Sequence, residues 1–150
     1  MIAYLDTSAL VKLYVEEEGS ALVHEAVKGA EESLTSVVAY PEARAALARA
    51  RRERVLTPAD YRATVDALDA DWGALGVVQA EEGLARRAGL LAEKHALRGF
   101  DAIHLASGLA SIGGADGAVF ICFDGRLAQG ARREGLKVLG VAAKAGRQSR

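Results

Sequence analysis

The chain has 150 residues, a length that fits one domain, which we place at residues 1–150 with a basic tail from about residue 142. Hydrophobic residues make up 51% and charged residues 26% of it, proportions that exclude wholesale disorder and repetitive fibrous structures. With 19 Lys plus Arg against 20 Asp plus Glu, the formal charge is -1, so the overall positive field of many nucleic-acid-binding proteins is absent.

Four apolar runs and a weaker one predict β-strands. In chain order they cover residues 2–5, 33–38, 75–79 (the weaker run), 118–123 and 137–141. The stretches between them show apolar spacings of three and four, as one face of a helix demands, and residues 40–97 are expected to be mostly helical. Continuous apolar strands joined by helices are typical of a parallel sheet covered on both faces. We expect a three-layer α/β/α domain with a mostly parallel central sheet.

Capping chemistry locates several helix starts. Ser20 precedes a helical stretch at residues 21–28, Thr57 precedes a proline in a first turn, and Asp101 precedes a helical stretch at residues 102–110. Each of these residues is therefore predicted to be an N-cap.

The compartment is indicated by the cysteine count and the N-terminus. A single cysteine, Cys122, cannot form an intramolecular disulfide, and residues 1–10 lack the features of a signal peptide. No apolar run approaches the ~20 residues that span a bilayer. We expect a soluble protein of the reducing cytoplasm without membrane contacts.

Four acidic residues stand where predicted strands end or helices begin. Asp6 and Asp124 end strands, Glu42 lies just after a strand, and Asp101 opens a helix. Each alone is explained as a helix cap or a first-turn carboxylate. Capping does not require these helix starts to converge, whereas ligands of open parallel sheets bind beyond the carboxyl ends of the strands. Convergence favours one shared site.

Several carboxylates in one cleft need a compensating cation. Two of them ~5 Å apart repel by about 3 kcal/mol at an effective dielectric of ~20. Oxygen ligands without Cys or His pairs suit one or two Mg²⁺ or Mn²⁺ ions, which activate water for phosphodiester hydrolysis. The predicted metal ligands and catalytic residues are the four acids Asp6, Glu42, Asp101 and Asp124. Ser8 is a supporting hydroxyl or, alternatively, bonds locally at the helix start.

Four segments carry a family resemblance: DTSALVKLY with Asp6, the helix-borne Glu42, FDAIHLASGLA with Asp101, and FICFDGRLAQGA with Asp124. Together they resemble PIN-domain ribonucleases, in particular VapC-type toxins of toxin–antitoxin pairs, over about residues 2–141. The resemblance implies a Mg²⁺- or Mn²⁺-dependent endoribonuclease that cuts RNA, is commonly a homodimer, and is inhibited by a small cognate antitoxin. The family often carries Thr or Ser where this chain has Cys122, so the fourth acid is expected to be a weaker ligand if that hydroxyl takes part.

Other candidates have ordinary explanations. Residues 42–54 carry a local charge of +3, and charge pattern alone makes Arg49, Arg52 and Arg126 candidates for phosphate contacts. His104 is expected to be buried and hydrogen-bonded, with a metal pair at Asp101 as the alternative. The aromatic residues Tyr4, Trp72, Phe100 and Phe120 are scattered, and core packing is predicted for all of them. The apolar stretch at residues 10–15 belongs to the core or lies under a partner.

Other functions remain open from the residues alone. Aspartyl-nucleophile phosphatases usually read Asp-x-Asp, whereas Ser8 stands at the second position here, and the acidic pair of receiver-like domains is missing. A non-catalytic RNA- or protein-binding module on the same fold is the main alternative, and the residues do not separate RNA from DNA as substrate.

Overall fold

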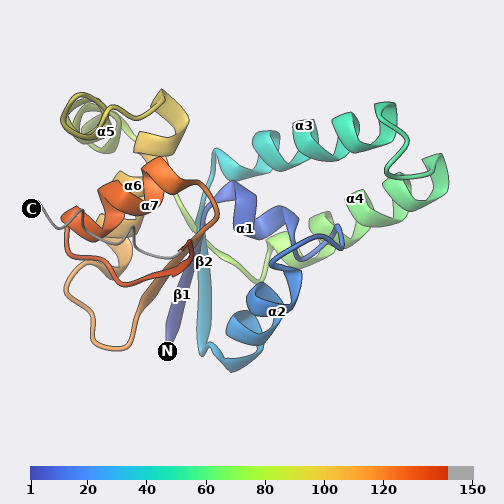
Figure 1. Cartoon of the computed structure of the whole chain (residues 1–150), viewed down its shortest axis with the longest axis horizontal. Helices are drawn as coiled ribbons and strands as arrows, with labels where there is room; N and C mark the ends of the chain where they lie inside the picture. Colours follow the sequence, from blue (N-terminus) through green and yellow to red (C-terminus); the bar gives the residue numbers. More distant parts are fainter. Residues whose placement is uncertain (142–150) are drawn as a thin grey trace, which may run out of the picture.

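The computed structural model describes residues 1–141, and the predicted tail cations from Lys144 onward lie outside the described residues. Helices separate consecutive strands throughout this part of the chain (Figure 1). The elements are β1 (Ile2–Leu5), α1 (Thr7–Val11), α2 (Ser20–Gly29), β2 (Glu32–Ser36), α3 (Ala39–Arg52), α4 (Pro58–Trp72), β3 (Gly76–Val78), α5 (Glu82–His95), α6 (Gly99–Ile112), β4 (Val119–Cys122), α7 (Gly125–Arg133) and β5 (Val138–Gly140).

The five strands form one sheet in the order β3-β2-β1-β4-β5, and every pairing is parallel. All five predicted strands are present, including the weak one at β3. The second strand ends at Ser36, two residues earlier than predicted, because residues 37–38 already turn into α3. With β1 in the centre, the residue that follows it, Asp6, lies in the middle of the carboxyl edge of the sheet.

Alternating side chains of the central strands supply two cores. Tyr4 and Phe120 stack with ring centroids 5.0 Å apart in the core under α5, α6 and α7. Leu5 and Ile121 point to the opposite face, where they pack with residues of α1 and α2. The predicted three-layer α/β/α arrangement with helices on both faces is confirmed (Figure 1).

A third cluster packs α1 against α3 and α4, which lie side by side as an antiparallel pair beyond the edge of the sheet (Figure 1). Leu10, Leu47 and Leu68 are completely buried there. The apolar stretch at residues 10–15 contributes to this cluster, so the core absorbs it. No helix within residues 1–141 is long and apolar enough to cross a membrane.

One predicted cap is confirmed and two are wrong. The Thr57 hydroxyl accepts the backbone N–H of Asp60 at the start of α4. Ser20 is inside α2 rather than before it: Gly19, with a left-handed φ of 91°, is the N-cap, while the Ser20 hydroxyl donates to the Val15 carbonyl. Asp101 is not a cap either, because α6 begins at Gly99 and places Asp101 in its first turn.

Candidate active site

A cleft of about 550 Å³ opens at the carboxyl edge of the sheet, between α1 and α3 on one side and α6 on the other. Although they come from four separate parts of the chain, all four predicted acids line it: Asp6, Glu42, Asp101 and Asp124. The expected convergence is therefore present, while the role of each acid as a metal ligand stays a prediction.

Asp6 is the most deeply placed of the four acids, with 3% of its surface exposed. Its Oδ1 caps α1 by accepting the backbone N–H of Ala9 at 2.9 Å, and it also accepts the Ser8 hydroxyl at 2.7 Å. Burial raises the pKa of Asp6 to about 6, and the negative charge of Asp101 acts in the same direction. His104 and these two hydrogen bonds lower the pKa, but they do not outweigh burial. The protein alone therefore does not supply enough positive charge and hydrogen bonding to stabilise the ionised form of Asp6.

Ser8 joins two strand ends. While its hydroxyl donates to Asp6, it also accepts the backbone N–H of Phe123, at 3.1 Å, just beyond β4. This bond closes the gap between the first turn of α1 and the segment that carries Asp124. Ser8 is both a local helix-start residue and a support of the acid cluster, so the two interpretations of its sequence position are compatible.

Glu42 is held by a buried hydrogen-bond network. Its Oε1 accepts the Thr7 hydroxyl at 2.6 Å and lies 3.0 Å from Nε2 of His104, while the Tyr4 hydroxyl lies 2.9 Å from Nδ1 of the same ring. These partners assign the imidazole proton to Nε2. Burial acts to raise the pKa of Glu42, but the bonds from His104 and Thr7 outweigh it and lower the pKa below its ordinary value.

His104 is thus the buried, hydrogen-bonded residue that the sequence favoured, with 1% of its surface exposed. Thr7 lies 2.9 Å from the same Nε2, so the ring fixes both Thr7 and Glu42 in the cleft. No spacing rule in the sequence links residues 4, 7, 42 and 104; the packing of α1, α3 and α6 around the end of β1 brings them together.

Asp101 and Asp124 face each other across the mouth of the cleft. The exposed Asp124 caps α7, its Oδ1 accepting the backbone N–H of Leu127 at 2.8 Å. Asp101 is half-buried, and burial, followed by the charges of Asp124 and Glu42, raises its pKa. The acids therefore repel one another as the sequence argument required, and a cation between them would relieve this repulsion.

The donor set suits a hard divalent cation. Within residues 1–141, no three His, Cys, Asp or Glu side chains are gathered closely enough to form a complete metal site by themselves. Mg²⁺ keeps several waters and is commonly held by one or two carboxylates plus substrate phosphates. Asp6, Glu42 and Asp124 each accept the hydrogen bonds described above with a single carboxylate oxygen. The other oxygen of each carboxylate takes no part in these bonds.

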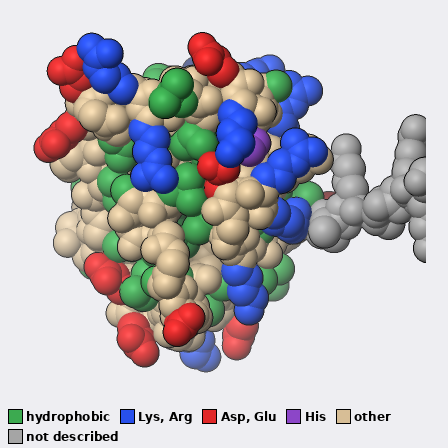
Figure 2. All heavy atoms as spheres, turned by 90° about the vertical axis from the view of Figure 1, so that its left-hand side faces the viewer, with side chains coloured by type: hydrophobic (Ala, Val, Ile, Leu, Met, Phe, Trp, Pro, Cys, Tyr) green, Lys and Arg blue, Asp and Glu red, His purple; other side chains and the backbone are tan. Residues whose placement is uncertain are grey.

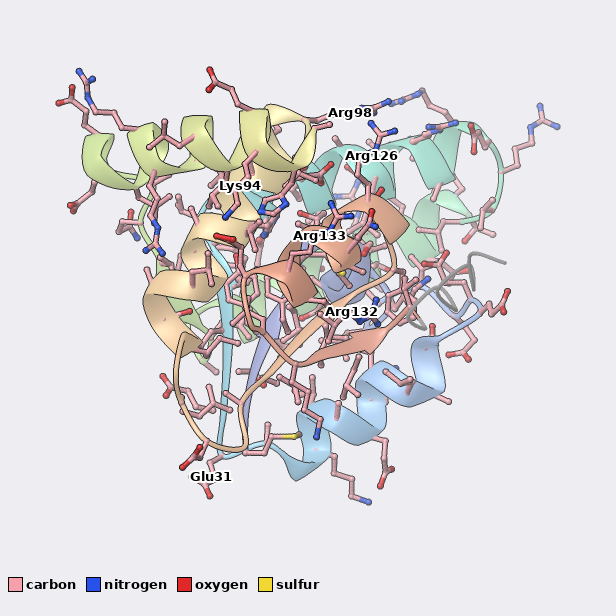
Figure 3. The ribbon with its side chains drawn as sticks, turned by 60° about the vertical axis from the view of Figure 1, so that its left-hand side comes forward. Glu31, Lys94, Arg98, Arg126, Arg132 and Arg133 are labelled. Atoms are coloured by element: carbon pink, nitrogen blue, oxygen red, sulfur yellow. The ribbon has the colours of Figure 1, made fainter. Side chains whose placement is uncertain are left out.

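Cations border the cleft. Arg49 and Arg98 line it, and Arg126 joins Arg98, Asp101 and Asp124 around an adjoining hollow. In Figure 2, which faces the left-hand side of Figure 1, Lys and Arg side chains gather mostly over the upper part of the view, and Figure 3 shows Arg98 and Arg126 near its upper edge. Of the predicted phosphate contacts, Arg49 and Arg126 are therefore near the acids, whereas Arg52 is an exposed residue of α3 outside the cleft lining.

The remaining side chains separate into core and surface. Cys122 is fully buried; its thiol contacts the backbone carbonyl of Asp124 at 3.8 Å, and burial raises its pKa. Tyr4 and Phe120 are core residues, and Trp72 packs partly buried against α3. The prediction for Phe100 was wrong: 56% of its surface is exposed, because the first turn of α6 carries it outward beside Asp101.

Known proteins of similar sequence show the family of the chain. The PIN domain family matches residues 3–132 of the chain. Ribonuclease VapC45 and Ribonuclease VapC49, from two strains of Mycobacterium tuberculosis, are each 42% identical to it over 137 residues, which cover 91% of this chain and 94% of either relative.

Solved structures share the fold at lower identity. PAE2754 from Pyrobaculum aerophilum gives a TM-score of 0.65 at 20% identity, over 92% of this chain and 83% of that one. VapBC2 from Rickettsia felis, bound to a DNA fragment from their promoter, gives 0.59 at 14% identity, over 93% and 98%. Such identities show the fold alone. Since the family match covers most of the chain and the Mycobacterium tuberculosis relatives are 42% identical, the chain belongs to the PIN domain family.

Proposed function

We propose that the protein is a Mg²⁺- or Mn²⁺-dependent endoribonuclease and the toxin of a toxin–antitoxin pair. The observation that carries this proposal is the convergence of four carboxylates from separate elements on one cleft. The 42% identity to two relatives named ribonucleases supports RNA as the substrate class. A non-catalytic binding module would not need mutually repelling acids whose charges raise the pKa of Asp101.

The four acids would hold one or two ions. A bound Mg²⁺ or Mn²⁺ supplies a polarised water and neutralises charge that develops on the phosphate. Asp6 contributes the deepest carboxylate, and its raised pKa means that a cation nearby stabilises the ionised form. Thr7 and His104 keep Glu42 ionised and fixed in orientation through their bonds to Oε1. Ser8 holds Asp6 against the end of β4.

The basic side chains would bind the RNA backbone. Arg49 and Arg98 line the cleft, and Arg126 lies beside Asp101 and Asp124. Contacts of this kind position a strand without reading its bases. They supply the local positive charge that a chain with a formal charge of -1 does not provide globally.

A protein inhibitor and a second copy are the proposed partners. One similar structure, from Klebsiella pneumoniae, is a toxin–antitoxin complex. We propose a small cognate antitoxin for this chain and a homodimer in its absence. Light scattering should give the mass of a dimer, and a monomer at high concentration would contradict this part of the proposal.

The test uses purified, partner-free protein. Incubation with a labelled single-stranded RNA should give cleavage with Mg²⁺ or Mn²⁺ and none with EDTA, while a single-stranded DNA of the same sequence reports on the choice of sugar. Expression of the toxin alone should also arrest growth, and the product of an adjacent small gene should relieve the arrest. Absence of metal-dependent RNA cleavage under all these conditions would refute the proposal.

A further inference from the structure

An exposed aromatic side chain lies directly beside the acid cluster. Phe100 occupies the first turn of α6, next to Asp101, and 56% of its surface is accessible. Within residues 1–141 it belongs to none of the three hydrophobic clusters. Burial of a large apolar ring is favourable, so this ring is available to a ligand that covers it. What distinguishes Phe100 from other exposed apolar side chains such as Leu90 is its place beside Asp101, where a ligand bound in the cleft can reach the ring.

Phe100 borders a hollow that is continuous with the cleft. This hollow, of about 440 Å³, is lined by five residues: Glu42, Arg98, Gly99, Phe100 and Asp101. Three of them, Glu42, Arg98 and Asp101, also line the main cleft. An RNA strand with a phosphate at the carboxylates therefore has space for an adjacent nucleotide against the Phe100 ring.

Arg98 supplies the matching charge. It is exposed, it lines the main cleft and both neighbouring hollows, and within the described residues it forms no salt bridge. Figure 3 shows it at the upper edge of the molecule beside Arg126. Guanidinium groups bind phosphate in a bidentate manner, and an unpaired one does so without breaking an existing ion pair.

We propose that Phe100 and Arg98 form a nucleotide-binding subsite, in which the Phe100 ring stacks on a base next to the scissile phosphate and Arg98 binds a flanking phosphate. The proposal rests on the ribonuclease function proposed above. Every base has a π-face, so the subsite accepts different bases but requires one that is unstacked from its neighbours. It therefore selects single-stranded RNA over a duplex.

Direct binding in EDTA tests the subsite separately from cleavage. A fluorescein-labelled single-stranded RNA is titrated with the parent and with Phe100→Ala, Phe100→Leu and Phe100→Trp. Loss of base stacking should weaken binding by roughly 5- to 100-fold in the Ala and Leu variants, whereas Trp should stay within about threefold of the parent. Leu90→Ala is the matched control, because Leu90 is an exposed apolar residue on α5, 69% accessible and outside the cleft. It should bind like the parent.

Base removal identifies the stacked nucleotide. In a series of RNAs that each lack one base, removal of the stacked base should weaken binding to the parent by the same factor as Phe100→Ala does. The same RNA should bind Phe100→Ala as tightly as the intact RNA does, since the two changes remove one interaction. The melting temperatures of the Phe100 and Leu90 variants should match that of the parent, because both residues are exposed.

Three outcomes overturn the subsite. If Phe100→Leu binds RNA like the parent, apolar bulk is sufficient and the surface is one for a protein. If light scattering shows that Phe100→Ala loses a dimer, the ring packs against a second copy. If the parent binds and cuts RNA and Phe100→Ala does so equally well, the subsite is wrong while the ribonuclease function stands. A parent that neither binds nor cuts RNA refutes both.

Discussion

Replacing Asp6 with asparagine separates a helix cap from a site carboxylate. Asparagine keeps an oxygen that can accept the Ala9 N–H and the Ser8 hydroxyl, so the cap survives. The charge is lost, however, and burial has raised the pKa of Asp6 from an ordinary 3.8 to about 6. A shift of this size corresponds to about 3 kcal/mol of cost for ionising the carboxyl in the folded protein at neutral pH. Metal-free Asp6→Asn should therefore be more stable than the parent, by about 2 to 3 kcal/mol.

The stability gained by Asp6→Asn should depend on pH. Because the folded protein holds this proton to higher pH than the unfolded chain does, the favourable contribution of Asp6 is present below about pH 4 and is lost as the pH rises through about 6. The advantage of Asp6→Asn over the parent should thus be near zero at pH 4 and reach its plateau above pH 6. Urea denaturation in EDTA measures it.

The same variant should lose function. RNA cleavage should fall by several orders of magnitude, and stabilisation by Mn²⁺ should shrink, because a neutral amide is a poor ligand for the ion. Asp116→Asn, at an exposed position before β4, is the matched control and should change neither property. Parallel pH profiles for parent and Asp6→Asn, or full metal-dependent cleavage by Asp6→Asn, would refute the reasoning.

Three further predictions concern the ion and the network around it. Millimolar Mg²⁺ or Mn²⁺ should raise the melting temperature and EDTA should reverse the rise, because the ion binds the folded state; calorimetry without Mn²⁺ uptake would contradict this. Ser8→Ala leaves the Phe123 N–H without its acceptor and removes one of the two hydrogen bonds to Asp6, so it should cost about 1–2 kcal/mol in urea denaturation, with a smaller loss of cleavage than Asp6→Asn; unchanged stability would argue against the Ser8 link. Tyr4→Phe removes the partner of His104 Nδ1 and should cost about 1–2 kcal/mol while cleavage falls less than tenfold; a complete loss of cleavage in a folded variant would mean that Tyr4 does more than support the ring.

Local sequence pattern was sufficient for the sheet and for the convergence of the acids. Continuous apolar runs predicted β1 to β5 because strands of a parallel sheet are covered on both faces, and parallel strands necessarily bring their following residues to one edge. Asp6 and Asp124 were predictable as caps for the same reason that they were predictable as site residues: both properties follow from standing between a strand and a helix.

Contacts set by the packing of helices at the sheet edge were beyond the sequence. His104 meets Tyr4 and Glu42 across 100 and 62 positions of the chain, and no local spacing encodes such a meeting. The start of α6 was misplaced because its N-cap, Arg98, makes no side-chain capping bond, so the cap signal at Asp101 was read instead. That error of three residues also hid Phe100, which the earlier helix start places on an exposed first turn.

Cleavage of single-stranded RNA by the parent and by variants of each carboxylate tests the central claim most directly. The four variants are Asp6→Asn, Glu42→Gln, Asp101→Asn and Asp124→Asn, each measured with Mn²⁺ beside a thermal melt. The parent should cut RNA only with the metal, and every folded variant should lose most of this activity, because the acids line one cleft and are proposed to act on one phosphate. Two or more folded variants with the activity of the parent would contradict a shared site.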